Sequence, residues 1–130
     1  MTKDEVIKEF RATMDMIALY RQWDDDTQYL SSTTAIMEHP AVQKLKDMGE
    51  RALKHSLLRM QCGEASWGDI MLVGILAGLR GPAIPPHMRG KYYDICNLYI
   101  KWGIRNGFAD ARFGEHIKVG KSGDTDNSST

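Results

Sequence analysis

The side chains that could bind a metal or move a proton are scattered along this chain of 130 residues. Its four histidines are His39, His55, His87 and His116. No two of them stand at the spacing of a His-x-x-x-His or His-Glu-x-x-His zinc motif. The imidazole of His39 has an acidic neighbour, Glu38, but adjacent residues rarely face one another. We therefore expect His39 to cap or hydrogen-bond at the His-Pro turn rather than to act as a ligand or catalyst.

Three consecutive carboxylates, Asp24, Asp25 and Asp26, form the densest acidic cluster. Carboxylate oxygens suit a divalent cation, but the triplet lacks the turn glycine and the bidentate glutamate of an EF-hand loop. Carboxylates at a helix C-terminus also oppose the helix dipole, so we expect the triplet to begin a new turn. It is interpreted as a solvated acidic loop or a patch for a basic partner, and no metal site is predicted.

A basic group flanks the proline-rich segment 81–86. Its members are Arg80, His87, Arg89 and Lys91. Arginine and lysine at this place could hold phosphates or the carboxylates of a partner. The alternative is that Arg80 caps a helix C-terminus and that the other three side chains are simply solvated.

No motif of a known catalytic type occurs in the sequence. It has no Gly-x-Ser-x-Gly, no phosphate-binding loop and no Gly-x-Gly-x-x-Gly, so we predict no catalytic residue, no metal and no cofactor. Cys62 and Cys96 fall inside predicted helices and are expected to be two buried thiols of a cytosolic protein.

The composition is that of a single globular domain. Lysine plus arginine equals aspartate plus glutamate at 17 each, so no overall charge draws the chain to nucleic acid or to an anionic membrane. Residues 1–40 hold 4 basic and 8 acidic side chains, and residues 41–119 hold 12 basic and 7 acidic ones. The start is charged, and the apolar run 70–79 is much shorter than the roughly 20 residues of a membrane span. We expect a cytoplasmic protein that does not enter a membrane.

Prolines, glycines and serines divide the chain into stretches of helical length. In the first stretch, Val6, Phe10, Met14 and Ile17 recur at helical spacing and are expected to face the core. The predicted helices cover 4–23, 34–38, 40–48, 50–61, 67–79 and 86–106. No strand pattern occurs, which predicts an all-α compact bundle of about five to six helices, with HEAT-like helix pairs as one arrangement.

The helix predicted over 67–79 is apolar nearly all round, which is typical of the most buried helix of a domain. Its Gly74 and Gly78 form a small-xxx-small pair that indicates close helix packing. Segment 81–86 is expected to be an extended linker. Residues 1–117 are predicted to form a single helical domain, and residues 118–130, which are rich in glycine, serine and polar side chains, a disordered tail.

An ordered set of these residues resembles a family of small, mostly uncharacterised bacterial and phage-associated helical proteins. The shared positions are Trp23, Ser31-Ser32, His39-Pro40-Ala41, Leu45, Met48-Gly49, Ala52-Leu53, Leu57-Leu58, Trp67, Gly81-Pro82, Arg89-Gly90 and Trp102-Gly103. The chain departs from that family at Val42, where an aromatic is usual. Its helix-turn-helix spacing is similar to that of HEAT-like repeats, except at Gly68-Asp69. The resemblance implies a helical fold and brings no activity with it.

Two functions fit these observations. The first is a non-enzymatic protein-binding module, such as an antitoxin-like protein, an inhibitor or an accessory factor, whose partner-binding candidates are the acidic triplet and the basic group. The second is association with nucleic acid through a local basic patch of Arg80, Arg89, Lys91, Lys101 and Arg105. An enzyme built on His39 and nearby acids ranks third. The oligomeric state is left open.

Overall fold

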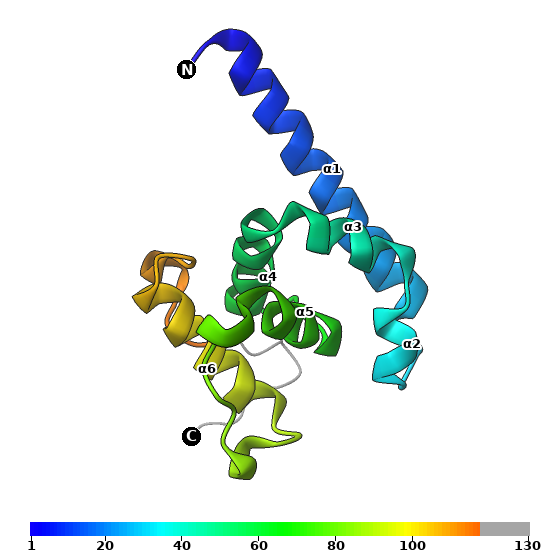
Figure 1. The fold of residues 1–130 in the computed structure, drawn as a ribbon, viewed down its shortest axis with the longest axis vertical. Helices are drawn as coiled ribbons and strands as arrows, with labels where there is room; N and C mark the ends of the chain where they lie inside the picture. The colour runs from blue at the N-terminus through cyan, green and yellow to red at the C-terminus, as the bar shows by residue number, and fades with distance from the viewer. Residues whose placement is uncertain (118–130) are drawn as a thin grey trace. The chain divides into compact units, whose positions relative to one another are not determined.

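The computed structural model describes residues 1–117, and in this range the chain contains helices and no strand. Six α-helices are present, which confirms the predicted all-α fold. They are α1 (Lys3–Thr27), α2 (Thr33–Met37), α3 (Pro40–Met48), α4 (Glu50–Cys62), α5 (Trp67–Ala77) and α6 (Tyr92–Arg105) (Figure 1). Three short 3₁₀ helices are η1 (Gly78–Arg80), η2 (Pro86–Met88) and η3 (Ala111–Phe113).

The chain divides into two compact units, Met1–Ala52 and Leu53–Thr130, and the boundary falls within α4. Each unit is described by itself below. The single domain predicted over residues 1–117 stays a prediction, and the predicted tail lies outside the described residues.

In the first unit, α1 begins with a capping box. The Thr2 hydroxyl accepts from the backbone N–H of Glu5 at 3.2 Å, and the Glu5 carboxylate accepts from the Thr2 N–H at 2.8 Å. The helix was predicted to end near Trp23, but it continues through the acidic triplet to Thr27. Carboxylates at a helix end cost only about 0.3–1 kcal/mol each, and the last turn also contains the bond of Thr27 Oγ1 to the Trp23 carbonyl at 2.6 Å and that of Gln28 Nε2 to the Asp25 carbonyl at 3.2 Å. The triplet therefore closes α1 instead of opening a new turn.

The face of α1 that packs is not the predicted one. Met16, Tyr20 and Trp23 are buried, while Val6, Phe10 and Met14 are exposed and Ile17 is half-buried. At 3.6 residues per turn, the exposed and buried triads point roughly 110° apart. The second half of α1 lies beside α3, and the first half extends beyond it (Figure 1).

Two buried hydrogen bonds fix the packed half of α1. The Tyr20 hydroxyl donates to the carbonyl of Ala52 at 2.9 Å, and Trp23 Nε1 donates to the carbonyl of Ile36 at 2.9 Å. Both aromatic side chains are only 1% exposed. The carbonyl of Ile36 lies on α2 and that of Ala52 in the first turn of α4, so these bonds hold both residues against α1.

The second unit is built on α4, α5 and α6, which share one core. Glycines allow two close approaches in it. A Cβ on Gly103 would come 2.7 Å from a Leu57 methyl carbon, and one on Gly74 would come 3.2 Å from the Tyr99 hydroxyl oxygen. The close packing predicted for the glycine pair holds at Gly74, whereas Gly78, with φ +57°, ends α5. The buried members of the core are Leu53, Leu57, Met60, Ile70, Val73, Ala77, Ile95, Cys96, Tyr99, Ile100, Trp102 and Ile117.

The proline-rich segment delays the start of α6. Pro86 begins a 3₁₀ turn, closed by the N–H of Arg89 on the Pro86 carbonyl at 3.2 Å, and Gly90 with φ +76° interrupts it. The helix therefore starts at Tyr92 and not near residue 86 as predicted. The start of the segment is held to α6, because the buried Trp102 donates from its Nε1 to the carbonyl of Arg80 at 2.8 Å.

Candidate functional site

The acidic triplet lies in the last turn of α1, where no basic side chain accompanies it. Asp25 and Asp26 are exposed and Asp24 is half-buried. The C-terminal end of the helix dipole adds negative potential at the same place. The triplet thus forms an acidic surface of the first unit.

His39 connects that acidic surface to α3. Its Nδ1 accepts from the N–H of Ala41 at 3.0 Å, and its Nε2 lies 2.8 Å from a carboxylate oxygen of Asp26. An Nδ1 that accepts has no proton of its own, so the proton lies on Nε2 and is donated to Asp26. Both ring nitrogens are therefore engaged, in agreement with the capping role expected for His39.

The basic group lies in the second unit, and all four of its side chains are exposed. Arg80 ends η1, where its guanidinium carbon lies 5.5 Å from the centre of the Phe108 ring. His87 is on η2, and Lys91 immediately precedes α6. Arg80 thus stacks on an aromatic ring, and the alternative in which it caps the preceding helix with its side chain is not what the structure shows.

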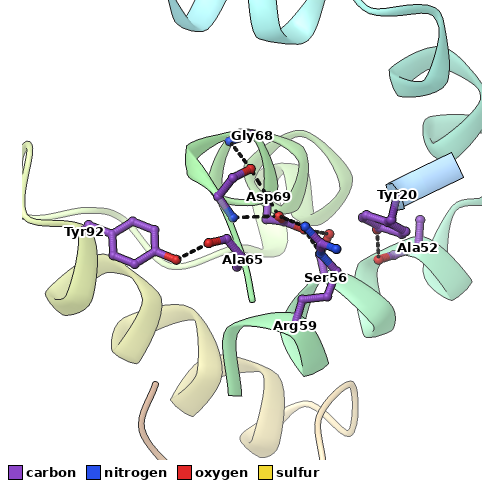
Figure 2. A network of polar contacts seen from close by, with 9 residues as sticks. Tyr20, Ala52, Ser56, Arg59, Ala65, Gly68, Asp69 and Tyr92 are labelled. Atoms are coloured by element: carbon purple, nitrogen blue, oxygen red, sulfur yellow. Dashed lines mark hydrogen bonds and ion pairs between the residues drawn. The ribbon is translucent and has the colours of Figure 1, made fainter. Parts of the chain in front are cut away.

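The most buried polar cluster joins α4 to α5 (Figure 2). Asp69 is fully buried and accepts from Ser56 Oγ at 2.8 Å, and from Nε and Nη2 of Arg59 at 3.0 Å each. The same carboxylate accepts from the N–H of Ser66, which completes the capping box at the start of α5. Every oxygen of this carboxylate is used in holding two helices together, so the cluster is structural.

His55, on α4, gives stability a predictable pH dependence. Burial lowers the pKa of His55 below its ordinary 6.5, and the nearby Arg59 lowers it further against the opposing pull of Asp69 and Glu64. The unfolded chain therefore binds the proton more readily, so stability is full above pH 6.5 and falls as the pH drops below it.

We expect the urea midpoint of the protein to decrease between pH 7.5 and pH 5.5, and to decrease less in His55→Gln. Any interaction that the glutamine loses acts at both pH values, so the difference in slope isolates the titration. Equal slopes for the two proteins would contradict the assignment.

The two cysteines differ, and the prediction that both are buried was wrong for one of them. Cys62 is exposed at the end of α4, whereas Cys96 is buried. Burial raises the pKa of the Cys96 thiol to about 12, although a hydrogen bond with Tyr92 acts in the opposite direction. Because the thiolate is the reactive form, Cys96 is expected to be inert near neutral pH.

With Ellman's reagent at pH 8, we expect one thiol per chain to react within minutes in the native protein and two in denaturant. Cys62→Ser should remove the fast reaction. Rapid reaction of a second thiol in the folded protein would show that the Cys96 site is open.

An apolar surface that the sequence analysis missed runs along α5. Trp67, Met71 and Ile75 occur every fourth residue, so they share one face, and they are 37%, 40% and 49% exposed. We call these three residues the α5 face. The prediction that α5 is the most buried helix holds for its other side, which contributes Ile70, Val73 and Ala77 to the core. Trp67 is accordingly partly exposed, unlike the buried Trp23 and Trp102.

Aromatic side chains border the first end of the α5 face, where Trp67 lies. At the first end, the Trp67 ring meets Tyr92 edge-on at 5.6 Å, and Tyr92 meets the exposed Tyr93 at 5.2 Å. The Tyr92 hydroxyl donates to the Ala65 carbonyl (Figure 2), and this bond holds the ring in its contact with Trp67. Lys91 immediately precedes Tyr92 in the chain.

The other end of the α5 face leads into η1. Leu79 and Arg80 follow directly, and both are exposed. Two members of the basic group predicted from the sequence, Arg80 and Lys91, are therefore close in the chain to the two ends of an apolar surface that the sequence did not reveal. A spacing of four between a tryptophan, a methionine and an isoleucine was visible, but a helix that is apolar on every side gives no sign of which side is exposed.

Within residues 1–117, no three histidine, cysteine, aspartate or glutamate side chains come together as metal ligands would. In the same range, none of the helices combines the length and the apolar character needed to cross a membrane. Comparison with protein-family models, with curated proteins and with solved structures finds no match to this chain.

Proposed function

We propose that this chain is a non-enzymatic module that docks onto another protein through the α5 face. One observation carries the proposal: a helix that supplies much of the unit's core also exposes Trp67, Met71 and Ile75 in a row. Contiguous exposed apolar surface of this kind is characteristic of interaction sites. Tryptophan and tyrosine are the side chains that most often dominate binding energy, and Trp67 and Tyr93 supply both.

The charges around the α5 face indicate the kind of partner. Lys91 immediately precedes Tyr92, whose ring contacts Trp67, and Arg80 follows the end of α5 in η1; no acidic side chain of α5 itself is exposed, since Asp69 is buried. Exposed cations at both ends favour a partner surface that is apolar in the middle and carries carboxylates at its margins. An amphipathic helix with acidic residues beside its apolar stripe has this chemistry.

Affinity capture with the purified, tagged chain tests this function. We expect host proteins to be retained by the wild type, with or without nuclease, and to be lost from Ile75→Asp. The matched control is Ala111→Asp, because it adds the same charge at an exposed position of the same unit away from α5. Circular dichroism of both variants shows that the helices are intact.

The same experiment distinguishes protein docking from binding to nucleic acid. The five basic residues of the alternative are all exposed, namely Arg80, Arg89, Lys91, Lys101 and Arg105. Binding through them would be abolished by nuclease, would weaken steeply with salt and would survive Ile75→Asp. That pattern would overturn the docking function.

A further inference from the structure

The first half of α1 exposes a second apolar surface, in the other unit. Val6, Ile7, Phe10 and Met14 are 51%, 39%, 65% and 48% exposed, and we call them the α1 stripe. Every residue from 1 to 11 is exposed, so this part of α1 rests on no core. Lone helical segments of this length are marginal in water, and packing of the apolar side is what normally stabilises them.

Contacts within the first unit leave the α1 stripe open. The unit packs against the side of α1 that carries Met16 and Tyr20, roughly 110° away. The Glu9 carboxylate, on that same side, pairs with Arg51 of α4 at 2.6 Å. The stripe therefore lies on a different side of α1 from the core of the unit and is not used by the Glu9–Arg51 ion pair.

We propose that the α1 stripe binds the α1 stripe of a second copy of this chain, with the two helices antiparallel. Val6 and Met14 lie four residues on either side of Phe10. A two-fold axis through Phe10 therefore places Phe10 against Phe10 and Val6 of each copy against Met14 of the other. Such a self-complementary arrangement is what a closed two-fold dimer requires.

The charges on this part of α1 fit a second copy better than a partner of one sign. Residues 3–11 hold three basic side chains, Lys3, Lys8 and Arg11, and three acidic ones. Two such segments do not repel each other, and antiparallel helices also oppose their dipoles.

The length of the stripe sets the strength of the pair. From Lys3 to Ile17 the helix extends only about 22 Å, and a pair of helices this short buries less than the roughly 800 Å² per partner of a standard interface. The dimer is therefore weak, and dissociates in the micromolar range of concentration. Self-association of the purified protein needs no other partner. Its test can therefore fail or succeed whether or not the chain docks onto another protein through the α5 face.

Sedimentation equilibrium of the full chain tests the pair directly. We expect the weight-average mass to rise from monomer toward dimer between about 5 and 500 μM, and Phe10→Glu to shift the midpoint at least tenfold upward or to abolish dimerisation. Tyr29→Glu is the matched control, because Tyr29 is an exposed aromatic of the same unit, 91% exposed and outside the stripe. A wild type that stays monomeric, or an equal effect of the two variants, would overturn the proposal.

Cysteine cross-linking tests the direction of the helices. In a Cys62→Ser background, a mixture of Val6→Cys and Met14→Cys chains should oxidise to a mixed disulfide dimer, and Phe10→Cys should cross-link with itself. Val6→Cys alone should cross-link poorly, because its counterpart lies about 12 Å away along the axis in the antiparallel register. Efficient cross-linking of Val6→Cys alone, with little in the mixture, would show a parallel pair and contradict the register.

Discussion

Replacing Asp69 with alanine is expected to lower the free energy of unfolding by about 3–5 kcal/mol, the usual loss when one member of a buried ion pair is removed. The carboxylate is fully buried, and it takes two N–H groups of Arg59 and the hydroxyl of Ser56. Its loss also removes half of the capping box at Ser66. Urea denaturation followed by fluorescence of Trp67 and Trp102, both in this unit, measures the change.

Two companion variants separate the causes. Ser56→Ala removes one neutral donor and is expected to cost only about 1 kcal/mol. Arg59→Met combined with Asp69→Leu replaces the pair by apolar side chains and should unfold at higher urea than Asp69→Ala. If Asp69→Ala were no less stable than Ser56→Ala, the ion pair would not hold α4 against α5.

The second large effect is expected at Trp23, in the other unit. Trp23→Ala removes a side chain that is 1% exposed and its hydrogen bond to the Ile36 carbonyl, and should cost about 3–5 kcal/mol. The damage should appear in α1, α2 and α3, because Trp23 connects the first two and lies one turn from Tyr20, which the ring contacts at 6.2 Å. Thermal unfolding, followed by the ellipticity at 222 nm, measures this loss of stability.

Trp23→Phe separates the ring from its N–H. It keeps most of the apolar volume and loses the donor to Ile36, so we expect a loss of about 1–2 kcal/mol. A phenylalanine variant as unstable as the alanine variant would mean that the hydrogen bond, and not the buried ring, dominates.

The sequence predicted the helix boundaries well wherever a cap fixes them. Ser66 with Asp69, and His39 before Pro40, act through bonds between near neighbours, and each begins its helix at the predicted residue. Where no local bond decides, prediction failed. Which side of α1 is buried depends on distant contacts, such as that of Trp23 with the Ile36 carbonyl thirteen residues away.

The candidate surfaces show the same division between local and distant causes. The sequence identified the charged residues around Arg80 and Asp24 because charge is visible in a sequence. It did not identify the α5 face or the α1 stripe, because apolar spacing predicts that a side is buried without saying against what. The stripe of Val6, Phe10 and Met14 has the period of a core helix, yet the core lies against Met16 and Tyr20.

The capping box at Thr2 has a consequence for the time scale of motion in α1. Residues 1–11 are all exposed, so the bonds of Thr2 with Glu5, the ion pair of Glu9 with Arg51 and the backbone ladder resist local opening there, whereas opening near Tyr20 must break its buried bond to Ala52. Amide hydrogens should accordingly exchange with solvent at rates that decrease along the helix from Val6 toward Trp23. Any molecule that covers the first turns would flatten that gradient, so the exchange profile of this one helix reports its occupancy.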